Sequence, residues 1–197
     1  MKAVKAAKPL EKTRDWSHFR DTWIRVLEKQ TGKGLNHWNA RIRKEEFANA
    51  RCLEAWLAKQ NVTGYAQQLL VMERFGYPAF FTATADELIN AQYADRPHLR
   101  PIYEAIVAAG RKLGEFVIQA RKGYVSLVTP RRTFARIQAT TKNRVDLGLR
   151  IDGKKPGGRL QPSKIHETMK FQISLTAPDD VDAEMLAWLK KAYEQSS

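Results

Sequence analysis

In the first half of the chain, apolar residues recur at three- and four-residue spacing, which indicates α-helices with one buried face. The first such stripe consists of Trp16, Phe19, Trp23 and Leu27. The glycine-containing turn 31–34 follows it, and glycine is the usual residue just after a helix end. Further helices are predicted over residues 35–43, 44–59, 64–75 and 85–91. In the helix over 44–59 the expected core residues are Phe47, Cys52, Trp56 and Leu57.

Between Glu115 and Thr176 the period of the pattern changes to two, which indicates β-strands. The expected strands are 115–121, 123–129, 133–140, 144–151 and 168–176. Short turns such as Lys122-Gly123 separate them and suit antiparallel hairpins. One helix precedes the strands, with Pro101 in its first turn, and a last helix is expected to be capped by Pro178-Asp179-Asp180.

These elements predict an α+β protein, with an all-helical N-terminal domain and a C-terminal antiparallel sheet packed by helices on one face. The Lys- and Ala-rich stretch 1–14 shows no such pattern, so we expect a flexible basic tail there. The helical domain is expected to span residues 15–92 and the α+β domain residues 93–197.

Alternation along the strands assigns each strand residue to one of the two faces of the sheet. The face expected to lie under helices carries Val125, Leu127, Ala135, Ile137, Val145, Leu147, Leu149, Ile173 and Leu175. The opposite face is expected to be open, and it carries Tyr124, Ser126, Arg136, Gln138, Asp146, Arg150, Gln172 and Ser174. Because its side chains are polar, this open face is the natural place for a ligand.

Several short motifs are distinctive in the C-terminal half. They are Leu99-Arg100-Pro101-Ile102-Tyr103, Lys122-Gly123-Tyr124-Val125-Ser126-Leu127, Arg144-Val145-Asp146-Leu147-Gly148-Leu149 and Trp188-Leu189. Together they resemble a bacterial family of domains of unknown function, for which the Asp146-Leu147-Gly148-Leu149 pattern is the more specific sign. Thr31-Gly32-Lys33, with Leu35 and Trp38, resembles a small uncharacterised helical domain that often precedes that family. The resemblance implies a two-domain layout and no established activity.

The charge of the chain is unusual, with 34 basic and 21 acidic residues and a net charge of +13. Most of the excess lies in two blocks: residues 111–170 hold 15 basic and 4 acidic side chains, and residues 1–52 hold 13 and 6. Concentrated positive charge favours polyanions or anionic membrane surfaces as partners. A solvated surface that only keeps the protein in solution would have the same composition.

Laid onto the expected sheet, the basic block 111–170 predicts a non-enzymatic protein that binds DNA or RNA. Arginine and lysine donate hydrogen bonds to phosphates, and an exposed base can stack on tyrosine. Basic hairpin tips would give affinity that depends on salt rather than on sequence. The expected contact residues are Arg121, Lys122, Tyr124, Arg131, Arg132, Arg136, Lys142, Arg144, Arg150, Lys154, Lys155 and Arg159.

The same alternating and basic pattern is compatible with alternative functions. The open face could be plain solvent-exposed sheet, because lysines at strand edges also prevent aggregation. A second hypothesis is a small-ligand-binding module or an enzyme, with a site between the domains or on the open face around Tyr124, Arg136, Asp146 and Arg150. A third is a protein-interaction adaptor that binds through an apolar patch around the N-terminal tryptophans.

The sequence contains no recognisable catalytic, cofactor or metal motif. The single cysteine, Cys52, has no partner for an intramolecular disulfide, and the four histidines lack the spacing of metal ligands. The glycine-rich loop 152–159 lacks the spacing of a P-loop. No apolar run approaches the roughly 18 residues of a membrane span, and no signal-peptide pattern follows the first lysines. We therefore expect a cytoplasmic protein without a membrane partner.

Overall fold

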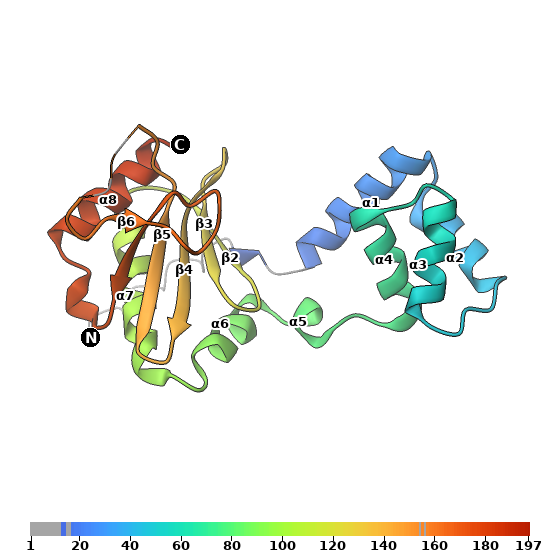
Figure 1. The fold of residues 1–197 in the computed structure, drawn as a ribbon, viewed down its shortest axis with the longest axis horizontal. Coiled ribbons are helices and arrows are strands. Elements are labelled where there is room, and N and C mark those ends of the chain that lie inside the picture. The colour runs from blue at the N-terminus through green and yellow to red at the C-terminus, as the bar shows by residue number, and fades with distance from the viewer. Residues whose placement is uncertain (1–12, 15–16, 154, 156) are drawn as a thin grey trace, which may run out of the picture. The chain divides into compact units, whose positions relative to one another are not determined.

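The computed structural model describes residues 13–14, 17–153, 155 and 157–197 (Figure 1). It contains two compact units, Asp15–Thr84 and a second one formed by Met1–Arg14 with Ala85–Ser197. Residues 1–12 of the expected basic tail lie outside the described part of the chain. Thr13–Arg14 form the short strand β1, which pairs in parallel with β2 of the second unit.

The unit Asp15–Thr84 is helical. Its helices are α1 (Ser17–Thr31), α2 (Leu35–Arg43), α3 (Ala50–Lys59), α4 (Gly64–Phe75) and α5 (Ala79–Thr82). The spans predicted for α2 and α4 are confirmed, and α1 ends before Gly32, whose φ of +67° suits glycine. The core of the unit consists of Trp23, Leu27, Trp38, Ile42, Leu53, Leu57, Val62, Ala66, Leu69, Leu70 and Phe81.

Helix α3 corrects two expectations. It begins at Ala50 rather than at residue 44, because the Asn49 side chain accepts a hydrogen bond from the Cys52 backbone N–H at 3.0 Å and caps the helix there. The buried stripe of the helix consists of Leu53 and Leu57, which are four residues apart. Cys52 lies next to this stripe and is exposed, so its expected place in the core was wrong.

A polar network joins three helical segments of this unit. The Arg20 guanidinium and the Tyr77 hydroxyl both donate to Oε1 of Glu73, and Asn39 donates to Oε2 at 3.3 Å. Burial alone would raise the pKa of Glu73, but the hydrogen bonds from Tyr77 and Arg20 outweigh it and hold this pKa below its usual range. Burial and the neighbouring carboxylate raise the pKa of Tyr77 to about 12.

The second unit is a sheet with helices. Its elements are α6 (Ala85–Tyr93), η1 (Pro97–Leu99), α7 (Arg100–Arg111), β2 (Val117–Ala120), β3 (Val125–Val128), β4 (Thr133–Thr141), β5 (Arg144–Leu149), β6 (Gln161–Pro162), β7 (Phe171–Leu175), η2 (Pro178–Asp180) and α8 (Ala183–Glu194). The strand order is β1-β2-β3-β4-β5-β7-β6, and all neighbours except β1 and β2 are antiparallel. The predicted α+β class is therefore confirmed.

Helices cover one face of this sheet, with α7 and α8 behind the strands in Figure 1. All nine residues predicted for the covered face are fully buried. Helix α8 begins at Ala183 and is capped by Asp182, which accepts from the Met185 backbone N–H at 2.9 Å. Pro178–Asp180, which were expected to cap that helix, instead form the separate short helix η2.

Helix α6 belongs to the sheet unit, whereas the sequence placed the boundary between domains after residue 92. Its Gln92 side chain donates to the backbone oxygens of Arg121 and Tyr124, at 2.7 and 3.3 Å. These bonds tie the end of α6 to the turn between β2 and β3. Hydrophobic periodicity shows that α6 is a helix, but it does not show which core the helix packs against.

We expect Gly114→Ala to destabilise the sheet unit. Gly114 has φ +148°, and a Cβ atom there would overlap the hydroxyl of Tyr193 in α8. The expected loss is about 2–4 kcal/mol, from backbone strain together with overpacking. Hydrogen exchange of the β4 and β5 amides measures this loss in the sheet unit alone. Gly123→Ala is the control, because its Cβ would meet open space; equal losses in the two variants would contradict the overlap with Tyr193 as the cause.

The Glu73 network predicts an acid-sensitive helical unit. Because the folded pKa of Glu73 is depressed, its stabilisation is complete above the pKa of the unfolded chain, about 4.3, and is lost as the pH falls through the folded pKa. Glu73→Gln should lower the stability by about 1–3 kcal/mol at pH 7 and remove part of this acid dependence. Urea unfolding followed by circular dichroism from pH 7 to about 3 tests both effects. Glu54→Gln, on the exposed side of α3, should leave the profile unchanged.

Candidate nucleic-acid interface

Two hairpin turns lie at the same end of the sheet. Strands β2 to β5 are consecutive and antiparallel, so the β2–β3 turn (121–124) and the β4–β5 turn (141–144) share one end, while the β3–β4 turn lies at the other (Figure 1). We call residues 121–124 and 141–144 the turn end. Lys122 and Lys142 are exposed there, one on each hairpin. The topology thus brings together side chains that are 20 residues apart in the sequence.

Near the turn end, three of the predicted residues interact on the open face: Tyr124, Arg121 and Arg136. The Cζ atom of Arg136 lies 3.8 Å from the centre of the Tyr124 ring, which is the geometry of a cation–π contact. Arg121 is 8% exposed and donates to the backbone oxygen of Ala120 at 3.0 Å. Burial lowers the pKa of Arg121 to about 10, and the nearby positive charge of Arg136 adds to this effect.

The carboxylate of Asp146 on this face already has partners within the protein. Asp146 is 1% exposed, accepts a hydrogen bond from the Ser174 hydroxyl at 2.6 Å and is ion-paired with Arg144 at 3.1 Å. Of the constellation considered for a small ligand, Tyr124 and Arg136 are therefore in contact, whereas Asp146 is paired with Arg144. Arg150 lies beyond the other end of β5 and donates to the backbone oxygen of Thr168 at 3.3 Å.

Arg131 and Arg132 lie in the β3–β4 turn, at the opposite end of the sheet. Arg132 donates to the Gln195 backbone oxygen at 2.6 Å and to the Ser196 hydroxyl at 3.1 Å, so it holds the C-terminal end of α8. Its neighbour Arg131 is exposed and has one long contact, 3.5 Å, with the same Gln195 oxygen.

Arg159 lies near the start of α8. It is ion-paired with Asp182 and, at 3.9 Å, with Asp180. Lys155 is exposed, and Lys154 lies outside the described residues. The loop that carries these residues is therefore tied to the α8 start by Arg159.

One basic residue at the turn end was missed by the sequence analysis. Arg96 follows α6 and donates from Nη1 to the backbone oxygens of Ala139 and Thr141, at 2.9 and 3.2 Å. With Lys122 it lines a surface hollow of about 180 Å³. It lies outside the two basic blocks of the sequence, so only its contact with β4 could have identified it.

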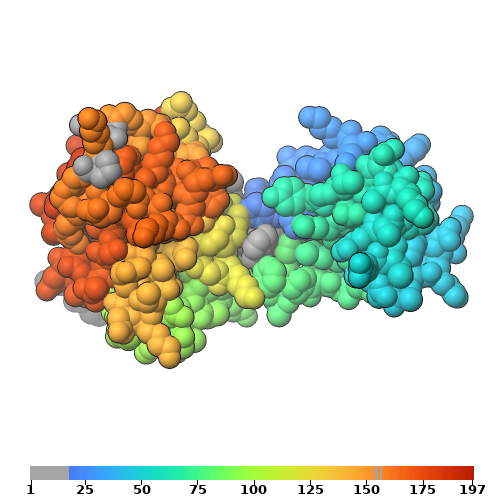
Figure 2. Space-filling model, in the orientation of Figure 1, coloured from blue at the N-terminus to red at the C-terminus, as the bar shows by residue number. Residues whose placement is uncertain are grey.

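Part of the open face is covered by the chain itself. Figure 2 shows atoms of the segment between β6 and β7 (orange-red) over the sheet, while the β4–β5 hairpin (orange) lies uncovered at the lower edge of this view. Met169 of this segment is 1% exposed and lies over Gly148, where an added Cβ would come within 3.1 Å of the Met169 Cβ. The accessible part of the open face is therefore the half nearer the turn end.

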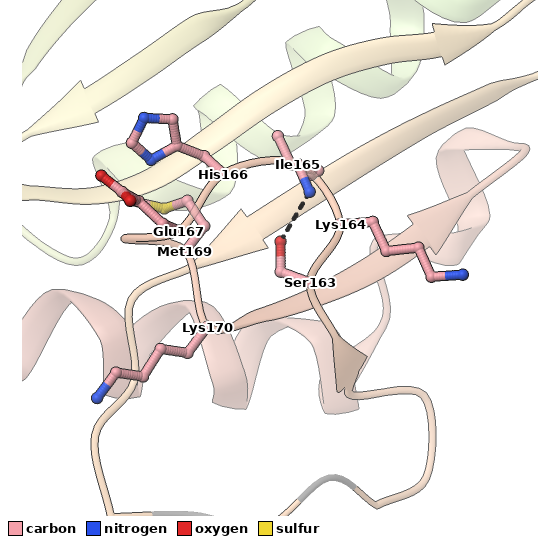
Figure 3. Close-up of a pocket in the computed structure, with 7 residues that line it drawn as sticks. All are labelled: Ser163, Lys164, Ile165, His166, Glu167, Met169 and Lys170. Carbon is pink, nitrogen blue, oxygen red and sulfur yellow. Dashed lines mark hydrogen bonds between the residues drawn. The ribbon is translucent and has the colours of Figure 1, made fainter.

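The covering segment forms a hollow of about 360 Å³, lined by Ser163, Lys164, Ile165, His166, Glu167, Met169 and Lys170 (Figure 3). Its two lysines point in different directions. The His166 ring is hydrogen-bonded at 2.9 Å to the Thr168 hydroxyl beside it. These side chains do not converge on one point as a catalytic site requires.

The described residues contain no group of three or more side chains that could hold a metal ion. Among the described helices, none combines the length and apolar character that crossing a bilayer requires.

In the helical unit, Thr31 of the Thr31-Gly32-Lys33 turn forms hydrogen bonds that join the end of α1 to α2. The Thr31 hydroxyl accepts a hydrogen bond from the Trp38 indole at 3.0 Å and donates to the Leu27 backbone oxygen at 2.8 Å. Trp23 and Trp38 are buried, and Trp56 is partly buried. The described part of this unit therefore gives the adaptor hypothesis no exposed patch built on tryptophan.

Comparison with known proteins places this architecture in a family. Residues 89–196 match DUF5655, a domain of unknown function, over more than half of the chain. The chain belongs to the DUF5655 family. No curated protein and no solved structure matches it.

The matched DUF5655 region corresponds to the sheet unit, and its Asp146-Leu147-Gly148-Leu149 stretch has a structural basis. Asp146 and Gly148 face the open side, where Asp146 binds Arg144 and Ser174 and Gly148 leaves room for Met169. Leu147 and Leu149 are fully buried on the helix side. Each position thus has a distinct packing or pairing role.

Substitution of the two neighbouring arginines of the β3–β4 turn should change the stability of the protein by different amounts. Arg132→Met removes hydrogen bonds to the C-terminal end of α8 while it keeps the apolar stem, and should cost roughly 1–2 kcal/mol. Arg131→Met, which has only the 3.5 Å contact, should cost less than about 0.5 kcal/mol. Hydrogen exchange of the α8 amides compares the two. If both variants destabilise α8 equally, Arg132 is not a structural anchor.

Proposed function

We propose that this DUF5655 protein is a non-enzymatic binding protein that contacts DNA or RNA through the turn end of its sheet. The observation that carries the proposal is that two hairpins place the exposed Lys122 and Lys142 at the same end of the sheet, next to the part of the open face where Tyr124 contacts Arg136. Six of the twelve residues expected from the sequence contribute to this surface: Arg121, Lys122, Tyr124, Arg136, Lys142 and Arg144.

The chemistry of this surface suits a phosphate backbone. Exposed lysines on hairpin tips can follow neighbouring phosphates with their flexible side chains, which gives affinity without reading bases. Each phosphate that is neutralised releases condensed counterions, so the affinity should fall steeply with salt. Tyr124 and the guanidinium plane of Arg136 offer a stacking surface for an unpaired base.

The basic residues at the other end of the sheet contribute less to this proposal. Arg132 and Arg159 hold the two ends of α8 through the contacts described above. Their charges are partly compensated by Asp152 for Arg132 and by Asp182 for Arg159, as the charge of Arg144 at the turn end is by Asp146. Net charge alone therefore overstates the surface available to a polyanion.

Three further properties are proposed from the sequence resemblance and its patterns. They are a bacterial origin, a cytoplasmic location, and kinship of the N-terminal unit with the helical domain that often precedes this family. Of these, the cytoplasmic location agrees with intracellular nucleic acid as the partner.

Removing two charges from the turn end should weaken binding. Lys122→Gln with Lys142→Gln should lower affinity for DNA or RNA roughly tenfold at about 50 mM salt and reduce the salt slope by about 2. Fluorescence anisotropy with single- and double-stranded oligonucleotides, over about 50–200 mM salt, measures both quantities.

The matched control is Lys112→Gln with Lys190→Gln, which removes the same charge at the end of α7 and in α8, on the helix-covered side. It should change affinity only slightly. If both pairs weaken binding equally, the turn end is not the interface. If the unchanged protein does not bind at the lowest salt concentration, the proposal is wrong.

A further inference from the structure

Two arginines interact with Tyr124 on the open face, Arg121 through a side-chain hydrogen bond and Arg136 through a cation–π contact. Arg121 follows β2, and Arg136 lies in β4 directly opposite Ser126 of β3. The Tyr124 ring holds the Arg136 guanidinium at 3.8 Å. The two positive charges are close enough for Arg136 to lower the pKa of Arg121, although burial is the larger cause.

Arg136 lacks the usual partners of a partly buried arginine. Among the described residues, no carboxylate forms an ion pair with it, and its buried Nε atom has no hydrogen-bond acceptor. The nearest acidic residue on this face by strand register is Asp146, two residues before Gly148, which lies opposite Arg136. Asp146 is engaged by Arg144 and Ser174 instead.

Such an arrangement is costly unless an anion completes it. A buried or partly buried donor without an acceptor, such as the Arg136 Nε–H group, loses its hydration and gains nothing in return. Two neighbouring positive charges on a partly desolvated surface also repel each other. Burial lowers the pKa of Arg136 as well, which reports the same unfavourable solvation.

From this geometry we infer that Arg121, Arg136 and Ser126 form a site for a single phosphate-type oxyanion. Guanidinium groups bind phosphate oxygens with two parallel hydrogen bonds, and a serine hydroxyl can donate a further one. Ser126 is 4% exposed and lies directly opposite Arg136 in the strand register. Tyr124 acts as a positioning residue, because its ring fixes the plane of the Arg136 guanidinium.

This inference deepens the proposed function and rests on it for the source of the ligand. The oxyanion is a nucleic-acid phosphate if the turn end binds DNA or RNA, and a free phosphate compound otherwise. The site differs from the lysines on the hairpin tips in one respect. Its donors are partly buried and held by packing, so it recognises the shape of an oxyanion in addition to its charge.

The test uses the full-length protein and inorganic phosphate at constant ionic strength. Phosphate should bind with a dissociation constant in the millimolar range or below and should shift the NMR signal of the Arg136 Nε–H group. Arg136→Lys, which keeps the charge but loses the planar fork, should weaken binding about tenfold. Ser126→Ala should weaken it less, and provides a second variant with little effect on packing.

Two controls separate shape from charge. Arg131→Lys makes the same change at the other end of the sheet and should bind phosphate normally. Lys112→Gln with Lys190→Gln, which removes two charges on the helix-covered side, should also retain phosphate binding. Absence of phosphate binding, or equal binding by the Arg136→Lys variant, would overturn the inference.

An oligonucleotide competition identifies the source of the oxyanion. If DNA or RNA displaces the phosphate, the site is part of the nucleic-acid interface. If the protein binds phosphate but no nucleic acid, the oxyanion site stands and the proposed function fails. If it binds nucleic acid but no phosphate, the proposed function stands and the oxyanion site fails.

Discussion

The chemistry of the C-terminal domain depends on the burial of one face of its sheet under helices. Side chains alternate along a strand, so burial of Val125, Leu127 and Ile137 on the helix side forces Tyr124, Ser126 and Arg136 onto the other side. A shift of one residue in register would reverse this assignment and place the arginines in the core. The buried residues on one face therefore determine which polar residues lie on the other face.

The strand connections decide which of these polar residues meet. Because β2 to β5 follow one another in antiparallel order, alternate turns lie at the same end of the sheet. The basic block of the sequence is divided by this rule into two groups. The group at 121–124 and 141–144 lies beside the accessible half of the open face, and the group around Arg132 and Arg159 lies against the two ends of α8.

The second group shows how a basic protein uses part of its charge for its own fold. The last carbonyl groups of a helix lack partners within the helix, and Arg132 donates to one of them, that of Gln195. At the other end of α8, Arg159 pairs with the helix-capping Asp182. The helical unit has a comparable device in Arg20, whose pKa is raised mainly by its hydrogen bond with Glu73. Charge that is paired in this way contributes less to the attraction of a polyanion.

The sequence by itself determined the secondary structure of most of the chain, the α+β class and the buried face of the sheet. These follow from the spacing of apolar residues along each element, which shows locally which of its faces is buried. It also determined that positive charge is concentrated in residues 111–170. Only the tertiary structure decided that α6 packs with the sheet, that Cys52 is exposed, and that Arg96 reaches the end of β4. It alone separated the arginines that hold α8 from those that surround Tyr124. These features depend on contacts between residues far apart in the sequence, and the identity of a residue does not specify its distant partner.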